Sequence, residues 1–107
     1  MVKRVMIFSL REGIDPDIFW KFWEEKHGAT FKNFPPLKKY TINKVRKIVR
    51  GAPLYWGIVE VWYENEDIYN KSLDHPIIDQ VRNDGFEEQI EDVFIAWVDE
   101  KVIKDVN

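Results

Sequence analysis

The chain contains no cysteine and only two histidines among its 107 residues. Without cysteine it cannot form disulfides, zinc–thiolate sites, iron–sulfur clusters or a thiol nucleophile. His27 and His75 do not form a His-x-x-x-His pair, and no aspartate-rich loop is present, so the sequence has no motif for a dedicated metal site. We therefore predict that the protein binds no metal and no cofactor.

Excess positive charge and long apolar runs are also missing. Sixteen Lys and Arg stand against nineteen Asp and Glu, for a net charge of −3, which disfavours general nucleic-acid binding. The apolar run at Val5–Phe8 is shorter than a signal-peptide core, and no stretch approaches the roughly 20 residues that cross a bilayer. We expect a cytoplasmic protein with no nucleic-acid or membrane partner.

Aromatic residues, by contrast, are abundant. Five Trp, seven Phe and four Tyr make up 15% of the chain, within an overall composition of 45% hydrophobic and 33% charged residues. That composition is typical of a globular protein, and no repeat or linker divides the sequence, so we predict one domain over residues 1–107. The aromatic content exceeds what the core of such a domain needs, which indicates a pocket or an interface lined by rings.

Local patterns predict the order β-α-β-β-α-β, which is that of an α+β, ferredoxin-like fold. Asp15 and Pro16 are a favourable helix start, and Gly28 is a candidate helix end. His75-Pro76 interrupts the second helical region. The predicted strands cover residues 2–10, 39–50, 54–63 and 92–98, and the predicted helical segments cover residues 15–27, 65–73 and 77–81.

Both faces of the predicted sheet carry apolar side chains. In the third strand Val59 and Val61 alternate with Ile58 and Trp62, and the fourth strand is apolar on both sides in the same way. Two helices can cover only one face of a four-stranded antiparallel sheet. The second apolar face therefore predicts a homodimer in which two antiparallel sheets pack face to face.

Four segments resemble the EthD-type branch of the dimeric α+β barrel proteins. Phe19–His27 is similar to the family's phenylalanine, aromatic-Trp and His pattern at the end of the first helix. Pro36-Leu37 followed by Tyr40–Asn43 resembles its Pro-Gly-Leu and Tyr-x-x-Asn segments. Gly57–Tyr63 resembles its Gly-Ile-Ala-Glu-Leu-Trp-Phe strand. The resemblance covers nearly the whole chain.

The resemblance implies ferredoxin-like subunits that pair into a barrel, with a pocket in each subunit between sheet and helices. Related barrel families include cofactor-free monooxygenases, cyclases, an isomerase and haem-degrading oxygenases, so fold alone does not name a reaction. Two departures concern the loops near the expected site. Gly28-Ala29-Thr30 stands where the family usually has Ala-Pro, and Pro36-Leu37 lacks the family's glycine.

His27 and Glu60 are the candidate catalytic residues. His27 follows Trp23 and Phe19 on one helical face, and its ordinary pKa near 6.5 suits proton transfer; alternatively it bonds the last helix carbonyls. Glu60 lies in an apolar strand, where a carboxylate is held by pairing or by a raised pKa; alternatively it pairs with a strand-two base such as Lys44. Facing each other across a pocket, His27 and Glu60 would form an acid–base pair.

Four further residues are candidates for substrate binding: Trp23, Tyr40, Asn43 and Trp62. Tyr40 and Asn43 follow from the resemblance and could polarise a phenolate or carbonyl oxygen. Residues three apart on a regular strand point to opposite faces, so both can line one pocket only with a bulge between them. Trp23 and Trp62 are expected in the core or the pocket wall.

These features predict a small dimeric barrel that binds an apolar or aromatic molecule between sheet and helices. The favoured activity is cofactor-free monooxygenase, cyclase or isomerase chemistry. One alternative is a non-enzymatic ligand-binding or stress-related barrel. A second is a haem-degrading barrel, for which Asn43, Trp62, His27 and His75 are the available residue types.

Overall fold

The computed structural model describes residues 1–106 as four strands and several short helices. In chain order the elements are β1 (Val2–Leu10), α1 (Pro16–Phe22), the π-helical turn η1 (Trp23–His27), α2 (Gly28–Phe31), β2 (Leu37–Lys44), β3 (Gly57–Tyr63), α3 (Glu66–Lys71), α4 (Pro76–Arg82), the 3₁₀ turn η2 (Glu87–Gln89) and β4 (Ile90–Val98).

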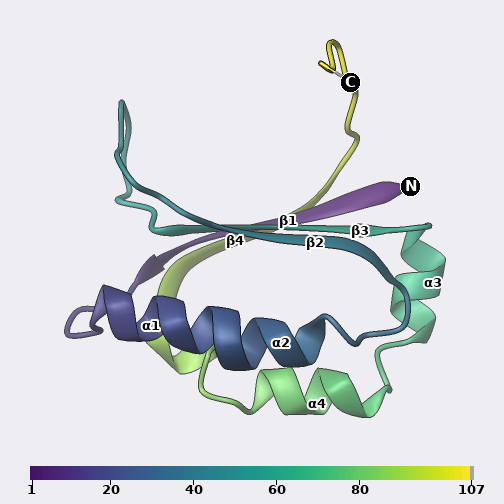
Figure 1. The fold of residues 1–107 in the computed structure, drawn as a ribbon, viewed down its shortest axis with the longest axis horizontal. Coiled ribbons are helices and arrows are strands. Elements are labelled where there is room, and N and C mark those ends of the chain that lie inside the picture. The colour runs from purple at the N-terminus through teal and green to yellow at the C-terminus, as the bar shows by residue number, and fades with distance from the viewer. Residues whose placement is uncertain (107) are drawn as a thin grey trace.

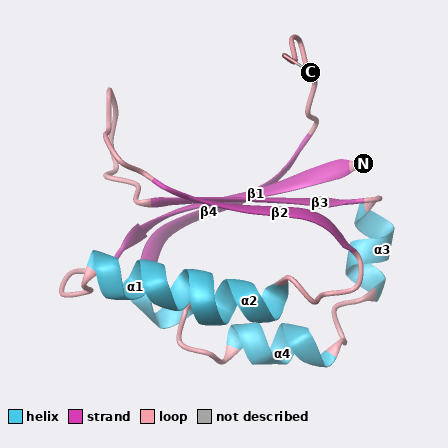
Figure 2. Cartoon of the chain, viewed as in Figure 1, coloured by secondary structure: helices cyan, strands magenta, loops and turns pink. Residues whose placement is uncertain are grey.

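The strands form one antiparallel sheet in the order β2-β3-β1-β4. The helices lie on one side of the sheet, while the β2–β3 loop and the C-terminal segment project on the other side (Figure 1). Figure 2 shows the same two layers by element type. The predicted α+β, ferredoxin-like fold is therefore confirmed.

Three helices begin at side-chain caps. Asp15 accepts hydrogen bonds from two backbone N–H groups at the start of α1, and Asn65 accepts one at the start of α3. His75 Nδ1 accepts the backbone N–H of Ile77 at 3.1 Å and so caps α4. Since each cap satisfies an N–H group that has no partner inside its helix, these starts are readable from the sequence.

The prediction that Gly28 ends the first helical region is wrong. The helical region continues through Gly28 to Phe31. The backbone N–H of Gly28 donates to the Trp23 carbonyl, five residues earlier, which is the hydrogen bond of a π-helical turn. A Cβ atom at Gly28 would lie 2.7 Å from that oxygen and 3.5 Å from the Tyr40 hydroxyl. Glycine here allows a close approach inside the helix rather than a stop.

The β2–β3 hairpin has shorter strands than predicted. β2 ends at Lys44 and β3 begins at Gly57, which are the last paired residues of the ladder, where strands 39–50 and 54–63 were expected. Beyond this pair Trp56 still packs against Phe8 and Phe19, but Val49 and Leu54 lack a covering layer and are 91% and 74% exposed. Strand propensity depends on a surface to pack against, so these residues form a loop.

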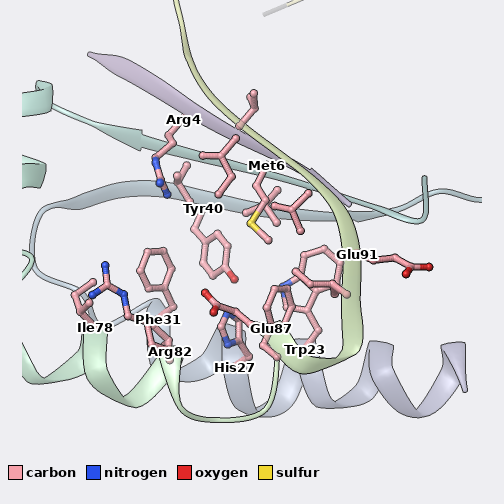
Figure 3. A pocket seen from close by; sticks show the side chains of 18 of the residues that line it. Arg4, Met6, Trp23, His27, Phe31, Tyr40, Ile78, Arg82, Glu87 and Glu91 are labelled. Atoms are coloured by element: carbon pink, nitrogen blue, oxygen red, sulfur yellow. The ribbon is translucent and has the colours of Figure 1, made fainter. Parts of the chain in front are cut away.

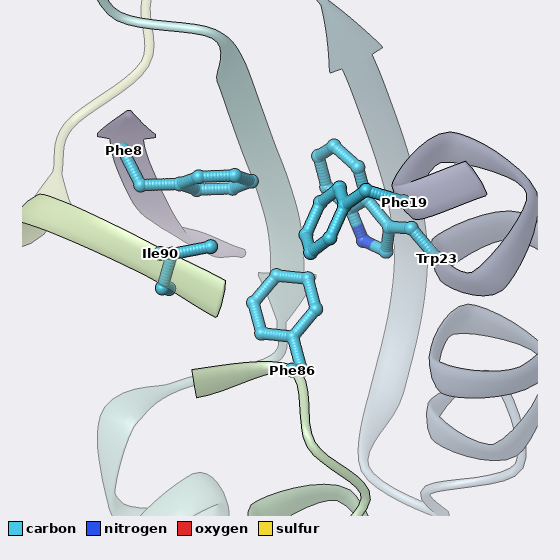
Figure 4. Close-up of a cluster of buried hydrophobic side chains, with 5 residues drawn as sticks. All are labelled: Phe8, Phe19, Trp23, Phe86 and Ile90. Atoms are coloured by element: carbon cyan, nitrogen blue, oxygen red, sulfur yellow. The ribbon is translucent and has the colours of Figure 1, made fainter. Parts of the chain in front are cut away.

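Two aromatic clusters fill the layer between sheet and helices. The first, shown in Figure 4, consists of Phe8, Phe19, Trp23, Phe86 and Ile90. The second consists of Phe34, Val61, Tyr63 and Ile78. Inclusion of Ile90 extends β4 two residues earlier than predicted. These buried rings fix the distance between the two layers, which positions the site described next.

The opposite face of the sheet, here called the open face, is not covered by a helix. Lys3 lies opposite Trp62 in the β1–β3 register and forms an ion pair with Glu60. Apolar side chains surround this polar centre, and Phe94 of β4 is 53% exposed. The second face of the sheet therefore carries apolar side chains, as expected, but they surround an ion-pair network that was not expected at its centre.

Candidate functional site

A cavity of about 730 Å³ lies between the sheet and the helices, with a size typical of a site for one small molecule (Figure 3). Side chains from both aromatic clusters line it, so it lies between them. Its polar lining includes Arg4, His27, Tyr40, Tyr63, Arg82 and Glu87. The cavity therefore combines ring surface with a few polar groups.

His27 is held in this cavity by two contacts from the segment that follows α4. Its Nδ1 lies 2.6 Å from Oδ2 of Asp84, and its ring stacks on Phe86 with centroids 4.0 Å apart and planes at 11°. The other Asp84 oxygen accepts the backbone N–H of Phe86 at 3.0 Å. Because Asp84 and Phe86 fix each other, both the orientation and the tautomer of His27 are set.

Burial lowers the pKa of His27 below its ordinary 6.5, while the Asp84 hydrogen bond and charge, and the charge of Glu87, act in the opposite direction. The imidazole is then neutral at pH 7. An ionised Asp84 can only accept, so Nδ1 carries the proton and Nε2 has a lone pair. Within residues 1–106 Nε2 has no hydrogen-bond partner. The arrangement is that of a general base oriented by a carboxylate.

Tyr40 and Trp23 supply hydrogen-bond donors beside His27. Trp23 is fully buried, and its Nε1–H has no partner within the described part of the chain. Burial raises the pKa of Tyr40 to about 12; the Trp23 N–H, which approaches the Tyr40 hydroxyl without reaching full hydrogen-bond geometry, acts against this, and the Asp84 charge acts with it. The Tyr40 hydroxyl is therefore protonated at neutral pH and can donate. Two donors beside a base can hold an oxygen that becomes negative.

Glu60 lies on the open face, away from His27. Its Oε2 is 2.6 Å from Lys3 Nζ, and Lys3 also contacts Glu100 at 2.9 Å. Thr41 Oγ1 and Asn43 Nδ2 donate to Glu60 Oε1 at 3.4 and 3.5 Å. The expected pairing of His27 with Glu60 is not formed, because residue 60 alternates with the cavity-lining Val59 and Val61. A base does hold Glu60, but it is Lys3 on β1 rather than a β2 lysine.

Asn43 and Trp62 share the open face with Glu60. Asn43 also donates to the Ile58 carbonyl at 3.1 Å. Trp62 donates its Nε1–H to Glu100 at 3.1 Å and lies beneath the Lys3 and Lys39 ammonium groups, at 5.0 and 4.7 Å from the ring centroid. No bulge separates Tyr40 from Asn43 in the β2–β3 register, so the two residues point to opposite faces.

The residue types of the haem alternative are not gathered at one place. His27 is in the cavity, Asn43 and Trp62 are on the open face, and His75 caps α4 with its ring beside Phe34. Of the candidate residues, the structure brings together His27, Trp23 and Tyr40. It separates them from Glu60, Asn43 and Trp62.

Asp84 is the functional candidate that the sequence did not indicate. It lies between Asn83 and Gly85, in a tripeptide that reads as a helix-breaking turn. Its partner His27 is 57 positions away, so only the folded chain joins them. The available signal was an acidic residue in a turn just before an aromatic one, which many ordinary turns share.

Among residues 1–106, no group of three or more His, Asp or Glu side chains is arranged to hold a metal ion. No helix in that range is both long and apolar enough to span a membrane.

Comparison with solved structures places the fold among known proteins. A protein of Arabidopsis thaliana superposes with a TM-score of 0.77 at 17% identity, over 97% of this chain and 99% of that one. A dimeric, ferredoxin-like protein of unknown function from Bacteroides fragilis gives 0.71 at 14% identity, over 92% and 95%. SnoaB, a cofactor-independent oxygenase from Streptomyces nogalater, gives 0.68 at 12% identity, over 98% and 95%. Identities this low support the fold alone.

Sequence comparison is more specific. No curated protein matches the chain significantly. The EthD domain matches residues 11–92, which is most of the chain and includes the cavity-lining residues Trp23, His27 and Tyr40. The segments that carry the resemblance in the sequence lie within this range. The chain therefore belongs to the EthD family.

Proposed function

We propose that the cavity binds an apolar, aromatic small molecule and that His27 removes a proton from it. The observation that carries this proposal is the His27–Asp84 pair, 2.6 Å apart, at the wall of a ring-lined cavity. Aromatic walls favour a flat, apolar ligand, while the pair provides a base that is neutral at pH 7. Asp84 takes the place beside His27 that the sequence analysis had suggested for Glu60.

The proposed step moves one proton. His27 Nε2 takes it from an acidic C–H next to a ring carbonyl, and the electron pair of that bond becomes an enolate. The enolate oxygen accepts hydrogen bonds from Tyr40 Oη–H and Trp23 Nε1–H. Trp23 Nε1 is buried and has no hydrogen-bond partner at bonding geometry within residues 1–106, although it lies close enough to the Tyr40 hydroxyl to lower the pKa of that phenol. A ligand oxygen would complete its bonding, and a negative enolate oxygen accepts more strongly than the ketone oxygen, which favours the enolate.

Proton removal is the first step of isomerisation, of cyclisation and of cofactor-free oxygenation, in which the carbanion reacts with dioxygen. The likeness to SnoaB, described as a cofactor-independent oxygenase, supports the third of these. The same fold also serves proteins without an assigned reaction. A reaction class is therefore tested best at the step that all three share.

Deuterium exchange tests this step directly. 2-Tetralone, a bicyclic ketone with an acidic C–H, is incubated with the protein in D₂O at neutral pD and followed by NMR. Wild type should accelerate exchange, and His27→Gln should reduce the acceleration by roughly 10²- to 10⁴-fold, as expected for loss of a general base. Gln can still bond to Asp84, so the fold should be kept.

The control is His75→Gln, which changes the only other histidine and should leave the exchange rate unchanged. If wild type binds the ketone but exchanges no faster than buffer, the protein is a ligand-binding barrel and the catalytic proposal is wrong. Equal rates for wild type and His27→Gln would also reject the role of His27.

We propose further that the open face packs against a second copy of the chain. The Bacteroides fragilis relative of similar fold is described as dimeric, which supports this arrangement. Phe94 is 53% exposed on this face, and the β2–β3 loop and C-terminal segment project beside it with exposed apolar side chains (Figure 1). Such a surface is typical of an interface.

Native mass spectrometry tests the assembly. A species at twice 12.9 kDa is expected, and Phe94→Glu should shift it toward monomer because two carboxylates would be buried at the interface. Ile18→Glu, at a 70% exposed position of α1 on the helix side of the sheet, serves as a matched control. A wild type that remains monomeric at micromolar concentration would contradict the dimer.

A further inference from the structure

The cavity has two chemically different sides. His27 and Trp23 lie on one side of the view in Figure 3, and Arg4 and Arg82 extend toward the other, Arg4 from the sheet and Arg82 from the end of α4. The first side contains the base and the oxygen-binding donors described above. The second side has no role in the proposed proton transfer.

Arg4 is held by rings rather than by an anion. Its guanidinium lies 5.1 Å from the Tyr69 ring centroid and 5.9 Å from that of Trp97. It is only partly exposed, on the helix-facing side of β1. Within residues 1–106 no carboxylate lies at ion-pair distance from Arg4 or Arg82, and neither guanidinium donates a hydrogen bond there. A half-buried guanidinium ordinarily has an anionic partner.

Tyr63 gives a second, independent indication. Its side chain is fully buried, lines the same cavity, and has a hydroxyl without a hydrogen-bond partner among the described residues. The Tyr63 ring lies 4.9 Å from the Tyr69 ring, centroid to centroid, and the Arg4 guanidinium lies over that same Tyr69 ring. Burial raises the pKa of Tyr63, and the Arg4 charge acts against this. A buried donor without an acceptor is costly unless a ligand satisfies it.

Nearby acidic side chains do not neutralise this side. Asp84, which lies behind His27 and is not part of the lining, is bonded to His27, and the charge of the lining residue Glu87 acts on His27 as well. Glu91 and Asp92 are exposed on β4, and Glu91 points away from Arg4 in Figure 3. Positive charge near Arg4 is thus available for an incoming group.

We propose that the ligand is an aromatic carboxylic acid, with its carboxylate bound by Arg4 and Tyr63 and attracted by the charge of the exposed lining residue Arg82. This inference rests on the proposed function, since it assigns the substrate class for the same cavity. The carboxylate orients the ring system so that its opposite edge reaches His27. A guanidinium and a phenol together offer the geometry that a carboxylate accepts.

Isothermal titration calorimetry of two matched probes tests the proposal. 2-Naphthoate and 2-naphthamide have the same ring system and nearly the same shape, but differ in charge. Wild type should bind the acid roughly 10- to 100-fold more tightly, as expected for charge-assisted hydrogen bonds. Arg4→Met keeps the aliphatic packing and should remove most of this preference. Arg82→Gln, at an exposed position, should remove part of it.

Arg46→Gln, on the β2–β3 loop, is the matched control and should keep the full preference. Equal affinity of wild type for acid and amide overturns the carboxylate site while leaving the aromatic cavity in place. Retention of the preference in both Arg4→Met and Arg82→Gln also overturns it. If the wild type binds neither the acid nor the amide, the proposed function itself is overturned, and this inference with it.

Discussion

The two faces of one sheet differ in what their polar groups do. On the helix-covered face, His27 and Asp84 form a pair beside donors that have no partner within residues 1–106. On the open face, Lys3 and Glu60 are joined to each other and to several neighbours. Unsatisfied donors around a cavity indicate a site for a ligand, whereas a satisfied network indicates structure.

The difference arises from strand alternation. Glu60 sits between Val59 and Val61, yet its side chain is on the other side of the sheet from theirs. A one-residue step in β3 therefore separates the cavity wall from the ion-pair network. Residues that are neighbours in the sequence can belong to separate functions, and the predictions below test that separation.

Stability should depend most on the covered face. Phe8→Ala removes a fully buried ring from the first aromatic cluster and should lower the free energy of unfolding by about 3–5 kcal/mol. Ile7→Ala removes a side chain from the opposite face of the same strand and should cost well under half as much. Urea denaturation at one protein concentration measures both. Equal losses would contradict the packing described here.

Asp84→Asn should separate orientation from binding. Asn can present an N–H to His27 and so favour the wrong tautomer, which should lower the exchange rate of 2-tetralone by roughly 10²-fold with little change in KM. Asp74→Asn, an exposed acidic residue before α4, is the control. A rise in KM at constant kcat would instead indicate that Asp84 only shapes the cavity.

The buried imidazole should make stability depend on pH. Because the folded pKa of His27 lies below 6.5, the unfolded chain binds more protons in the interval between the two values. The contribution of His27 is therefore fully present above pH 6.5 and is lost as pH falls through the folded pKa. His27→Gln should flatten this part of a plot of Tm against pH. An unchanged slope in the variant would contradict the lowered pKa.

The open-face network should contribute least. Glu60→Gln breaks the ion pair with Lys3 but keeps a side chain of similar shape, so the loss of stability should be about 1 kcal/mol or less. The loss should shrink further at high salt, since the pair is partly exposed. Thermal unfolding at low and high salt measures this, with Glu64→Gln as an exposed control.

Much of the fold could be predicted because its causes are local. Asp15 before Pro16 marks a helix start, and the alternation around Glu60 already placed Trp62 on the same face. The helical spacing that put His27 on the same face as Trp23 agrees with the structure, where both line the cavity. The continuation of the helix through Gly28 could not be predicted, because the glycine is needed for its close approach to the Trp23 carbonyl in a π-helical turn.

The partners of the site residues depend on tertiary contacts. His27 meets Asp84 across 57 positions, and Glu60 meets Lys3 through the pairing of β1 with β3. Neither contact produces a spacing pattern that can be recognised in the sequence. The sequence therefore singled out His27 and Glu60 but did not indicate the partner of either, Asp84 or Lys3.

The most direct test of the separation between faces is the rate of 2-tetralone exchange in Glu60→Gln, measured beside His27→Gln. The account predicts that Glu60→Gln keeps the wild-type rate within about threefold, while His27→Gln loses at least roughly 10²-fold. Equal, large losses in the two variants would contradict it. That result would mean that Glu60 takes part in the reaction and that His27 and Glu60 act together from opposite faces of the sheet.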